Sequence, residues 1–328
     1  MSVAASDSEK TAAPSERAPL TAATSLDEAR GIDLHLHSSA SDGRLTPTEL
    51  VDLCHAKGLS HIALTDHDTL AGVAEARERC AHHGMRLLCA SELSCQWRGM
   101  TIHVVALLPQ GPSAAFDVSL VGLAEARVRR AEEIARRLEK LGLDDALARA
   151  RAIAGSERPL GRPDFAQALV DAGLAADRQA AFKRYLGAGK RGDVKTHWPA
   201  LETVVGWIVE AGGVAVVAHP LRYGMTRRKR DLLFEAFIGA GGQAAELVSG
   251  YQNRDTTFDL SRQLAHHELY GSLGSDFHFP GGALAPGTLS PAPRSHVRPV
   301  WAHPALADFV TPIEPSPTEP SLAEPSST

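Results

Sequence analysis

Short apolar runs alternate with longer amphipathic stretches along most of this chain. Seven runs rich in Val, Ile, Leu and Ala have the length of buried strands. They occupy residues 32–36, 62–65, 86–90, 102–108, 214–218, 244–248 and 270–273. Amphipathic stretches typical of helices separate most of them, at residues 46–57, 70–83, 201–211, 228–240 and 256–267. This alternation predicts a parallel α/β fold in which helices cover the sheet.

One helix start is marked clearly in the sequence. In Thr46-Pro47-Thr48-Glu49, threonine is a favoured N-cap and proline is well suited to the first helical position. Glutamate three residues after the threonine completes a capping box. The sequence therefore predicts that a helix begins at Pro47.

The middle and the ends of the chain depart from the strand–helix alternation. Between residues 110 and 199 the strand signal disappears, and helical patterns remain at 120–141 and 163–172. We therefore expect a helical insertion at 110–199 within a barrel domain formed by residues 31–109 and 200–305. Residues 1–30 and 306–328 contain few large apolar side chains, so both are predicted to be disordered tails.

Charge and cysteine content narrow the class of protein. The net charge of −5 and the pI of about 6.3 argue against a protein that coats nucleic acid by electrostatic attraction. The four cysteines form no CxxC pair, which indicates reduced thiols. No segment reaches the roughly 18 consecutive apolar residues of a membrane helix, and the N-terminus lacks a signal-peptide pattern. We expect a cytoplasmic protein without a membrane partner.

Histidines and acidic residues recur where the predicted strands end. Loops at the carboxyl ends of parallel strands converge on one face of the fold, where such proteins gather their functional groups. The residues in question are His35, His37, His67, Glu92, His219, Asp276 and His278. His103 departs from this pattern because it lies near the start of its apolar run.

The spacing around the first run favours a metal site. His35 and His37 share one face of an extended strand, so both imidazoles can reach one cation. Asp42 follows in Ser41-Asp42-Gly43, where glycine permits a tight turn that returns the carboxylate toward the histidines. A single strand-end histidine is usually a surface residue, and an Asp-Gly pair is usually a turn. The prediction therefore depends on the coincidence of many positions.

The types of donor limit the metal. Nitrogen and oxygen donors without a thiolate suit divalent cations such as Mn²⁺, with Fe²⁺ or Zn²⁺ as alternatives. Asp66 and Asp68 are expected to orient ligands or to cap the next helix. The remaining strand-end and surface histidines are expected to be ordinary polar residues: His55, His61, His82, His83, His266, His267, His296 and His303.

The motifs, taken in order, resemble those of the polymerase-and-histidinol-phosphatase (PHP) family. They are His35-x-His37-Ser38, Ser41-Asp42-Gly43, Thr65-Asp66-His67-Asp68, Glu92, His103, Ala218-His219-Pro220 and Gly274-Ser275-Asp276-Phe277-His278. The resemblance implies a distorted seven-stranded β/α barrel with an inserted helical subdomain and three divalent cations, most often Mn²⁺. It also implies phosphoester hydrolysis by a metal-activated hydroxide.

The resemblance also implies how the ligands are divided. One cation would be held by His35, His37, Glu92 and Asp276. Glu92 would bridge to a second cation held by His103 and His219. Asp42, His67 and His278 would hold the third.

Further segments, at residues 218–223, 241–250 and 274–278, resemble the branch of the family that acts on nucleotides. That branch removes the 3'-phosphate of nucleoside 3',5'-bisphosphates and digests short 5'-phosphorylated RNA from its 5' end. A substrate with two phosphates implies a second anion site outside the metals. Candidates are Arg127, Arg130, Arg162, Lys195 and Arg222. Arg222 is favoured because it lies close to His219, whereas most arginines of the 120–141 helix fit a solvated face.

One residue departs from the pattern of this branch. Asp164 stands where the branch often has a histidine, and an aspartate would repel a phosphate unless it points elsewhere. Two other functions stay open: a small-molecule phosphatase of the same fold, such as a histidinol-phosphate phosphatase, and a noncatalytic metal-binding module. The inserted helices favour a nucleotide or short RNA as partner, and the complete ligand set argues against the noncatalytic module.

Overall fold

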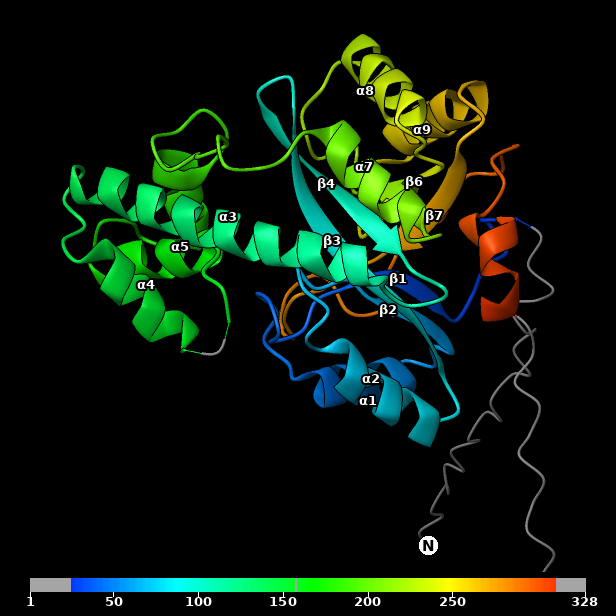
Figure 1. Cartoon of the computed structure of the whole chain (residues 1–328), viewed down its shortest axis with the longest axis horizontal. Helices are drawn as coiled ribbons and strands as arrows, with labels where there is room; N and C mark the ends of the chain where they lie inside the picture. Colours follow the sequence, from blue (N-terminus) through cyan, green and yellow to red (C-terminus); the bar gives the residue numbers. More distant parts are fainter. Residues whose placement is uncertain (1–24, 157, 311–328) are drawn as a thin grey trace, which may run out of the picture.

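The computed structural model describes residues 25–156 and 158–310 (Figure 1). Its strands are β1 (Ile32–Leu36), β2 (His61–Leu64), β3 (Arg86–Trp97), β4 (Met100–Leu107), β5 (Val214–Val217), β6 (Ala244–Ser249) and β7 (Tyr270–Gly274). They form one sheet in sequence order. The first and last strands meet, since the His37 amide donates to the Phe277 carbonyl at 3.0 Å and the Asp276 amide to the His35 carbonyl at 2.9 Å. The predicted distorted seven-stranded α/β barrel is therefore confirmed.

Helices cover the outside of the barrel on two sides (Figure 1). On one side lie α7 (Leu201–Glu210), α8 (Arg227–Gly239) and α9 (Arg254–His266), and on the other lie α1 (Pro47–Ala56) and α2 (Val73–His82). Helix α1 begins where the sequence predicted. The Thr46 hydroxyl accepts from the Glu49 amide at 3.2 Å, and the Thr46 amide donates to the Glu49 carboxylate at 2.9 Å.

One strand runs against the others, so the expectation of a fully parallel sheet was wrong. Strand β4 is antiparallel to both β3 and β5, and the other neighbouring pairs are parallel. Strand β3 continues to Trp97 instead of ending near residue 90. Arg98 and Gly99, both with positive φ, then form a two-residue hairpin turn. The reversal places the start of β4, and with it His103, near the carboxyl ends of the other strands.

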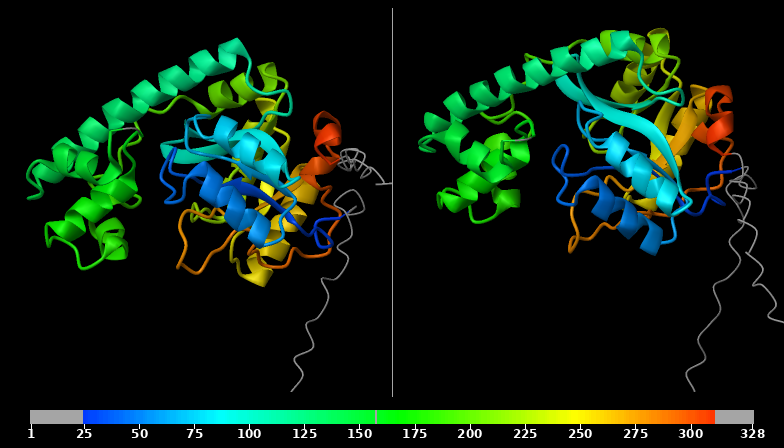
Figure 2. Two further views of the ribbon diagram at one scale, coloured as in Figure 1. Left: turned by 90° about the horizontal axis from the view of Figure 1, so that it is seen from below. Right: turned by 60° about the horizontal axis from the view of Figure 1, so that its bottom comes forward.

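The inserted helices extend from one side of the barrel (Figure 2). They are α3 (Ala114–Glu139), α4 (Ala146–Ala154), α5 (Arg162–Asp171), the short α6 (Arg178–Ala181) and the π-helix η2 (Phe182–Leu186). Helix α3 belongs to two cores. Phe116 and Leu123 in its first half pack with the barrel, and Leu138 in its second half packs with Phe165 and Leu186 of the insertion. The boundaries at residues 110 and 199 stay a prediction.

Helix α3 starts earlier than its apolar pattern indicated, at a Ser113 cap whose hydroxyl accepts from the Phe116 amide at 3.2 Å.

The two ends of the barrel domain also differ from expectation. Leu26 is buried in the barrel core, as are Leu306 and Phe309 of the 3-10 helix η4 (Pro304–Phe309), which follows η3 (Val300–Ala302). Disorder was therefore wrongly predicted at these positions. The rest of the predicted tails, at 1–24 and 311–328, lies outside the described residues.

Two further sequence expectations concern cysteines and membranes. Cys54, Cys80, Cys89 and Cys95 are all buried and form no disulfide. Within the described residues, no helix combines the length and apolarity that crossing a bilayer requires.

Removing the N-cap of α1 should weaken the fold. Thr46→Ala deletes the hydroxyl that satisfies the Glu49 amide, and such losses typically cost about 1 kcal/mol of unfolding free energy. Urea denaturation would measure this as a lower midpoint. Thr46→Ser keeps the hydroxyl and should stay close to the original protein; an equal loss in both variants would show that the cap is not the cause.

Candidate metal centre

The structure brings all nine predicted ligands into one region at the end of the barrel. His35 lies in β1, Glu92 in β3 and His103 in β4, and the remaining six follow strands or lie in the loop after β1. They are His37, Asp42, His67, His219, Asp276 and His278. Side chains that are far apart in sequence therefore approach within contact distance.

The most deeply buried group has the dimensions of a tetrahedral metal site. It contains His35, His37, Glu92 and Asp276. His35 Nε2 lies 3.0 Å from His37 Nε2, and both nitrogens lie 3.2–3.3 Å from Glu92 Oε2 and Asp276 Oδ1. Neighbouring donors around a tetrahedral cation with bonds of about 2.0 Å lie about 3.3 Å apart. These four atoms could therefore surround one divalent cation.

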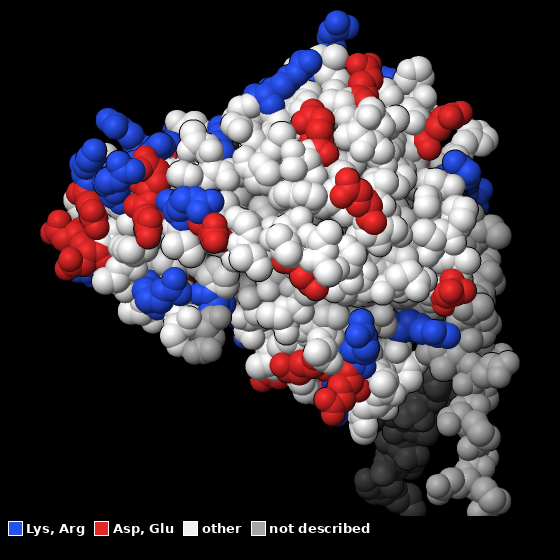
Figure 3. Space-filling view, in the orientation of Figure 1, with Lys and Arg blue, Asp and Glu red and all other residues white. Residues whose placement is uncertain are grey.

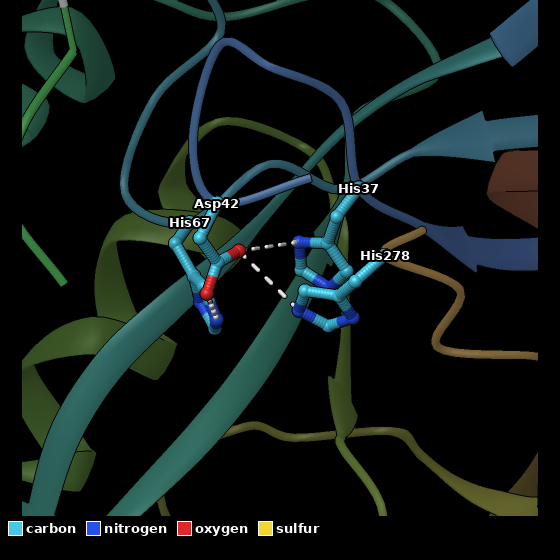
Figure 4. A group of neighbouring side chains, drawn as sticks. All are labelled: His37, Asp42, His67 and His278. Carbon is cyan, nitrogen blue, oxygen red and sulfur yellow. Dashed lines mark ion pairs between the residues drawn. The ribbon is translucent and has the colours of Figure 1, made fainter. Parts of the chain in front are cut away.

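A second group centres on the Asp42 carboxylate (Figure 4). Asp42 Oδ1 lies 3.3 Å from His278 Nε2 and 3.9 Å from His37 Nδ1, and Oδ2 lies 3.9 Å from His67 Nε2. The rings of His37 and His278 stack at 4.1 Å. This group contains the three ligands predicted for a third cation, together with His37.

Glu92 connects the remaining histidines. Its Oε1 lies 2.9 Å from His103 Nδ1 and 2.9 Å from His219 Nε2, while its Oε2 lies 3.1 Å from His67 Nδ1. One carboxylate thus contacts donors of all three predicted cation sites, as a bridging ligand would.

Several donor atoms in this region have no hydrogen-bond partner although they are buried. Among the described residues these include Asp42 Oδ1, Glu92 Oε2, His67 Nδ1 and His219 Nδ1. An unpartnered buried carboxylate oxygen is costly unless a cation compensates it. The donor set consists of imidazoles and carboxylates, which suit divalent transition metals. The residues present therefore fit the metals that the resemblance implies.

The buried carboxylates and histidines of the site shift one another's pKa values. Burial would raise the pKa of Glu92, but the adjacent His67 and His35 outweigh it and hold that pKa well below its usual range. Asp276 is held low in the same way, chiefly by His35. Burial lowers the pKa of His67 to about 3, so its ring is neutral. At His37, burial lowers the pKa, but hydrogen bonds to Asp276 and Glu92 outweigh it and raise the pKa to about 10. The anionic carboxylates and the neutral His67 ring are in the forms that bind metal, whereas His37 must release a proton when a cation binds.

The backbone near the ligands has two unusual features, positive φ angles and a closely packed glycine. His219 and Asp276 have positive φ, which is uncommon outside glycine and concentrates at functional sites. A Cβ on Gly274 would lie 2.2 Å from the Cβ of His35. Only glycine therefore lets β7 approach His35 closely enough to close this part of the barrel.

Sequence reasoning missed Glu246, a buried acid in the middle of β6. Its Oε1 lies 2.6 Å from His35 Nδ1, and its Oε2 accepts from the His219 backbone amide at 2.6 Å. A carboxylate on Nδ1 fixes the imidazole tautomer, so that Nε2 carries the lone pair toward the metal. The available signal was a lone charged residue inside a fully buried strand, Ala244–Ser249.

Asp66 and Asp68 support the site rather than cap a helix. The Asp66 carboxylate accepts from the Ser38 and Ser41 hydroxyls, both at 2.6 Å, and thereby holds the loop that carries Asp42. Asp68 accepts from the Ser94 amide at 2.6 Å and forms an ion pair with Arg127 of α3.

A pocket lies between the metal ligands and the inserted helices. On the barrel side it is lined by Asp42, His67 and His103, and on the other side by Arg127, Arg130 and Arg162. The guanidinium groups of Arg127 and Arg130 lie 5.4 and 5.2 Å from the centroid of the Trp198 ring, which also lines the pocket. Arg127 and Arg130 are at most 8% exposed. Burial, followed by the nearby Arg162 and Arg127 charges, lowers the pKa of Arg130 to about 9. Clustered buried cations of this kind favour an anion.

The other arginines predicted to lie on a solvated face do so. Arg129 forms an ion pair with Glu125, and both Arg136 and Arg137 pair with Glu133. Basic and acidic side chains accordingly intermingle over the surface of the insertion (Figure 3).

Three other residues considered from the sequence, Lys195, Arg222 and Asp164, do not line this pocket. Lys195 pairs with Asp193 at 2.9 Å. Arg222, the favoured candidate, instead pairs with the predicted ligand Asp276. Asp164 points away from the pocket, since it accepts from the Gly161 amide at 2.8 Å and pairs with Arg158 at 2.5 Å. Its negative charge is thus neutralised within the insertion.

Known proteins share both this sequence and this architecture. The PHP domain profile matches residues 33–158. The chain is 40% identical to a 3',5'-nucleoside bisphosphate phosphatase of Chromobacterium violaceum, over 82% of this chain and 95% of that protein. It is 41% identical to a 5'-3' exoribonuclease of Haemophilus influenzae, over 78% of this chain and 92% of that protein. A solved amidohydrolase structure from Chromobacterium violaceum, with bound sulfate, has 39% identity and a TM-score of 0.78, covering 85% of this chain and 96% of that one.

The barrel and its histidine–carboxylate clusters have the fold of a metal-dependent phosphoesterase. The chain belongs to the PHP family, as its motifs indicated.

Replacing Glu246 should weaken metal binding without removing a ligand. When His35 presents Nε2 to the metal, its Nδ1–H and the His219 backbone amide both donate to the Glu246 carboxylate. The side-chain amide of Glu246→Gln has only one oxygen and can therefore replace only one of the two acceptors. We expect metal affinity to fall by about 10- to 100-fold. Elemental analysis after dialysis against limiting Mn²⁺ would measure the loss, and melting in EDTA would check the fold. Glu235→Gln, on the exposed face of α8, is the matched control; equal metal content in the two variants would contradict this role.

Proposed function

We propose that this protein removes the 3'-phosphate of nucleoside 3',5'-bisphosphates and cleaves short 5'-phosphorylated RNA from the 5' end. The observation that carries the proposal is the arginine pocket directly beside the candidate metal ligands. Two anion sites next to each other suit a substrate with two phosphates on one nucleoside. The printed functions of the two curated relatives agree with this substrate class.

The proposed cofactors are three divalent cations, Mn²⁺ first, with Fe²⁺ or Zn²⁺ as alternatives. The candidate ligands are His35, His37, Asp42, His67, Glu92, His103, His219, Asp276 and His278. Bound cations would supply a nucleophile from water at neutral pH and would neutralise charge on the phosphate. The reduced state of four buried cysteines fits a cytoplasmic enzyme.

The chain's own residues position the substrate. Arg127 and Arg162 flank Arg130 in the pocket, and their guanidinium groups would bind the 5'-phosphate. Arg127 is itself oriented by Asp68, whereas Arg130 has no acidic partner among the described residues and donates Nε to the Val194 carbonyl. Arg162 likewise forms no ion pair among the described residues and donates to the Leu186 carbonyl at 3.4 Å, so Arg130 and Arg162 are more available to an anion than Arg127. With the 5'-phosphate bound there, the 3'-phosphate would extend toward His67 and His103.

The same pocket distinguishes this proposal from a histidinol-phosphate phosphatase. Histidinol phosphate carries an ammonium group in addition to its single phosphate. The three guanidinium groups beside the metal ligands, two of them buried, would repel that cation, and a single phosphate would leave the second anion site unused. A bisphosphate uses both sites. A noncatalytic role has no feature in its favour, because all nine candidate ligands are present.

Removing one candidate ligand should abolish turnover. Asp276→Ala deletes a carboxylate that lies 3.2–3.3 Å from the nitrogens of His35 and His37. We expect phosphate release from adenosine 3',5'-bisphosphate to become undetectable and the bound metal to decrease. Colorimetric phosphate assays and elemental analysis would follow both. Full activity in this variant would reject the assignment of the site.

The 5'-phosphate site can be tested by comparing two substrates. Arg130→Gln should lower kcat/KM for adenosine 3',5'-bisphosphate by about 10- to 100-fold, since a charged hydrogen bond contributes about 1.5–3 kcal/mol. Its effect on adenosine 3'-monophosphate, which lacks the 5'-phosphate, should be small. Arg129→Gln is the matched control, because Arg129 is exposed and paired with Glu125. Equal losses on both substrates would contradict a 5'-phosphate site.

A further inference from the structure

The proposed function fixes the direction in which an RNA strand leaves the site. With the 5'-phosphate among the arginines and the 3'-phosphate at the metal ligands, the second nucleotide is attached beyond the 3'-phosphate. The strand must therefore continue past the metal ligands on the side away from the arginine pocket. That pocket borders Asp42, His67 and His103, so the opposite side is formed by the loops that follow β5, β6 and β7.

A guanidinium group lies at that side. Arg222 forms an ion pair with Asp276 and also donates to the Ser249 carbonyl at 3.3 Å. Its side chain is 42% exposed. It thus bridges the loops after β5, β6 and β7 and still presents donors to solvent.

Two exposed aromatic side chains lie in the same loops. Tyr251, 60% exposed, follows the end of β6 by two residues, and Phe279, 42% exposed, directly follows the predicted ligand His278. The guanidinium of Arg44 lies 5.6 Å from the Phe279 ring centroid, and the Arg44 amide donates to the His278 carbonyl at 2.8 Å. Exposed aromatic rings of this kind offer flat faces on which bases can stack.

These four residues have the composition of a single-strand binding surface. Aromatic side chains stack on bases whatever the sequence, and arginines pair with the backbone phosphates. We propose that Arg44, Arg222, Tyr251 and Phe279 form a rim that binds the nucleotides on the 3' side of the cleaved bond. This inference rests on the proposed function. It gives the exoribonuclease activity a binding surface that nucleoside bisphosphates do not use.

The test compares a 5'-phosphorylated trinucleotide with adenosine 3',5'-bisphosphate. Tyr251→Ala should lower the ratio of kcat/KM for the trinucleotide to kcat/KM for the bisphosphate by about tenfold, mainly through a higher KM for the trinucleotide. Phe258→Ala is the matched control. Phe258 is also an exposed aromatic, but it lies on α9 over a groove lined by Asp27 and Pro291. Phe258→Ala should therefore leave the ratio of the two kcat/KM values equal to that of the original protein.

A second substrate separates stacking from a general disturbance of the site. A trinucleotide that lacks the base of its second and third nucleotides cannot stack on the rim. The original protein should handle this substrate at least as poorly as Tyr251→Ala handles the intact one, because the missing bases could stack on neither Tyr251 nor Phe279. Combining the variant with the base-free substrate should cause little additional loss, because both changes remove the same contact.

The outcomes are distinguishable. If the original protein releases phosphate from the bisphosphate but Tyr251→Ala leaves the ratio unchanged, or Phe258→Ala lowers it equally, the rim is rejected and the proposed function stands. Activity on the bisphosphate without any cleavage of the trinucleotide also rejects the rim. If neither substrate is hydrolysed with Mn²⁺ present, the proposed function itself fails.

Discussion

The site depends on one buried carboxylate that five histidines approach. Glu92 is 1% exposed, and its two oxygens lie within 3.3 Å of donors on His35, His37, His67, His103 and His219. These residues come from β1 to β5 or the loops that follow them. A buried anion surrounded by imidazoles is stable only if the strands keep their relative positions. The closure of the barrel through β1 and β7 provides that constraint, and Glu246 adds to it by holding His35 and His219 together.

Most of the side chains that the structure brings together could be named from the sequence because the information is local. His35 and His37 share a strand face, Asp42 follows in a glycine turn, and Asp276 and His278 end a strand. The strand reversal at Arg98-Gly99 is different, since it depends on how β3 and β4 pair. His103 therefore departed from the expected pattern until the antiparallel strand placed it beside Glu92.

Other features required tertiary contacts that no spacing reveals. Glu246 has no local motif, and its role is visible only from the two atoms that it contacts. Asp164 could have pointed toward or away from the phosphate, and Arg158 decides this by neutralising it inside the insertion. Arg222 is close to His219 in sequence, yet it lies against Asp276, whereas Arg130 reaches the pocket from a helix that is distant in sequence. Proximity to a metal ligand along the chain was therefore a poor guide to which arginine lines the pocket.

Helix α3 fixes the position of the arginine pocket relative to the candidate metal ligands. Its first half is anchored in the barrel core by Phe116 and Leu123, and the same 26-residue helix carries Arg127 and Arg130. A continuous helix curves only gently over such a length, so it holds the guanidinium groups at a set distance from the barrel. Under the proposed function, a substrate would therefore need two phosphates far enough apart to reach both the arginine pocket and the metal ligands, and a diphosphate whose phosphates are directly joined would be too short.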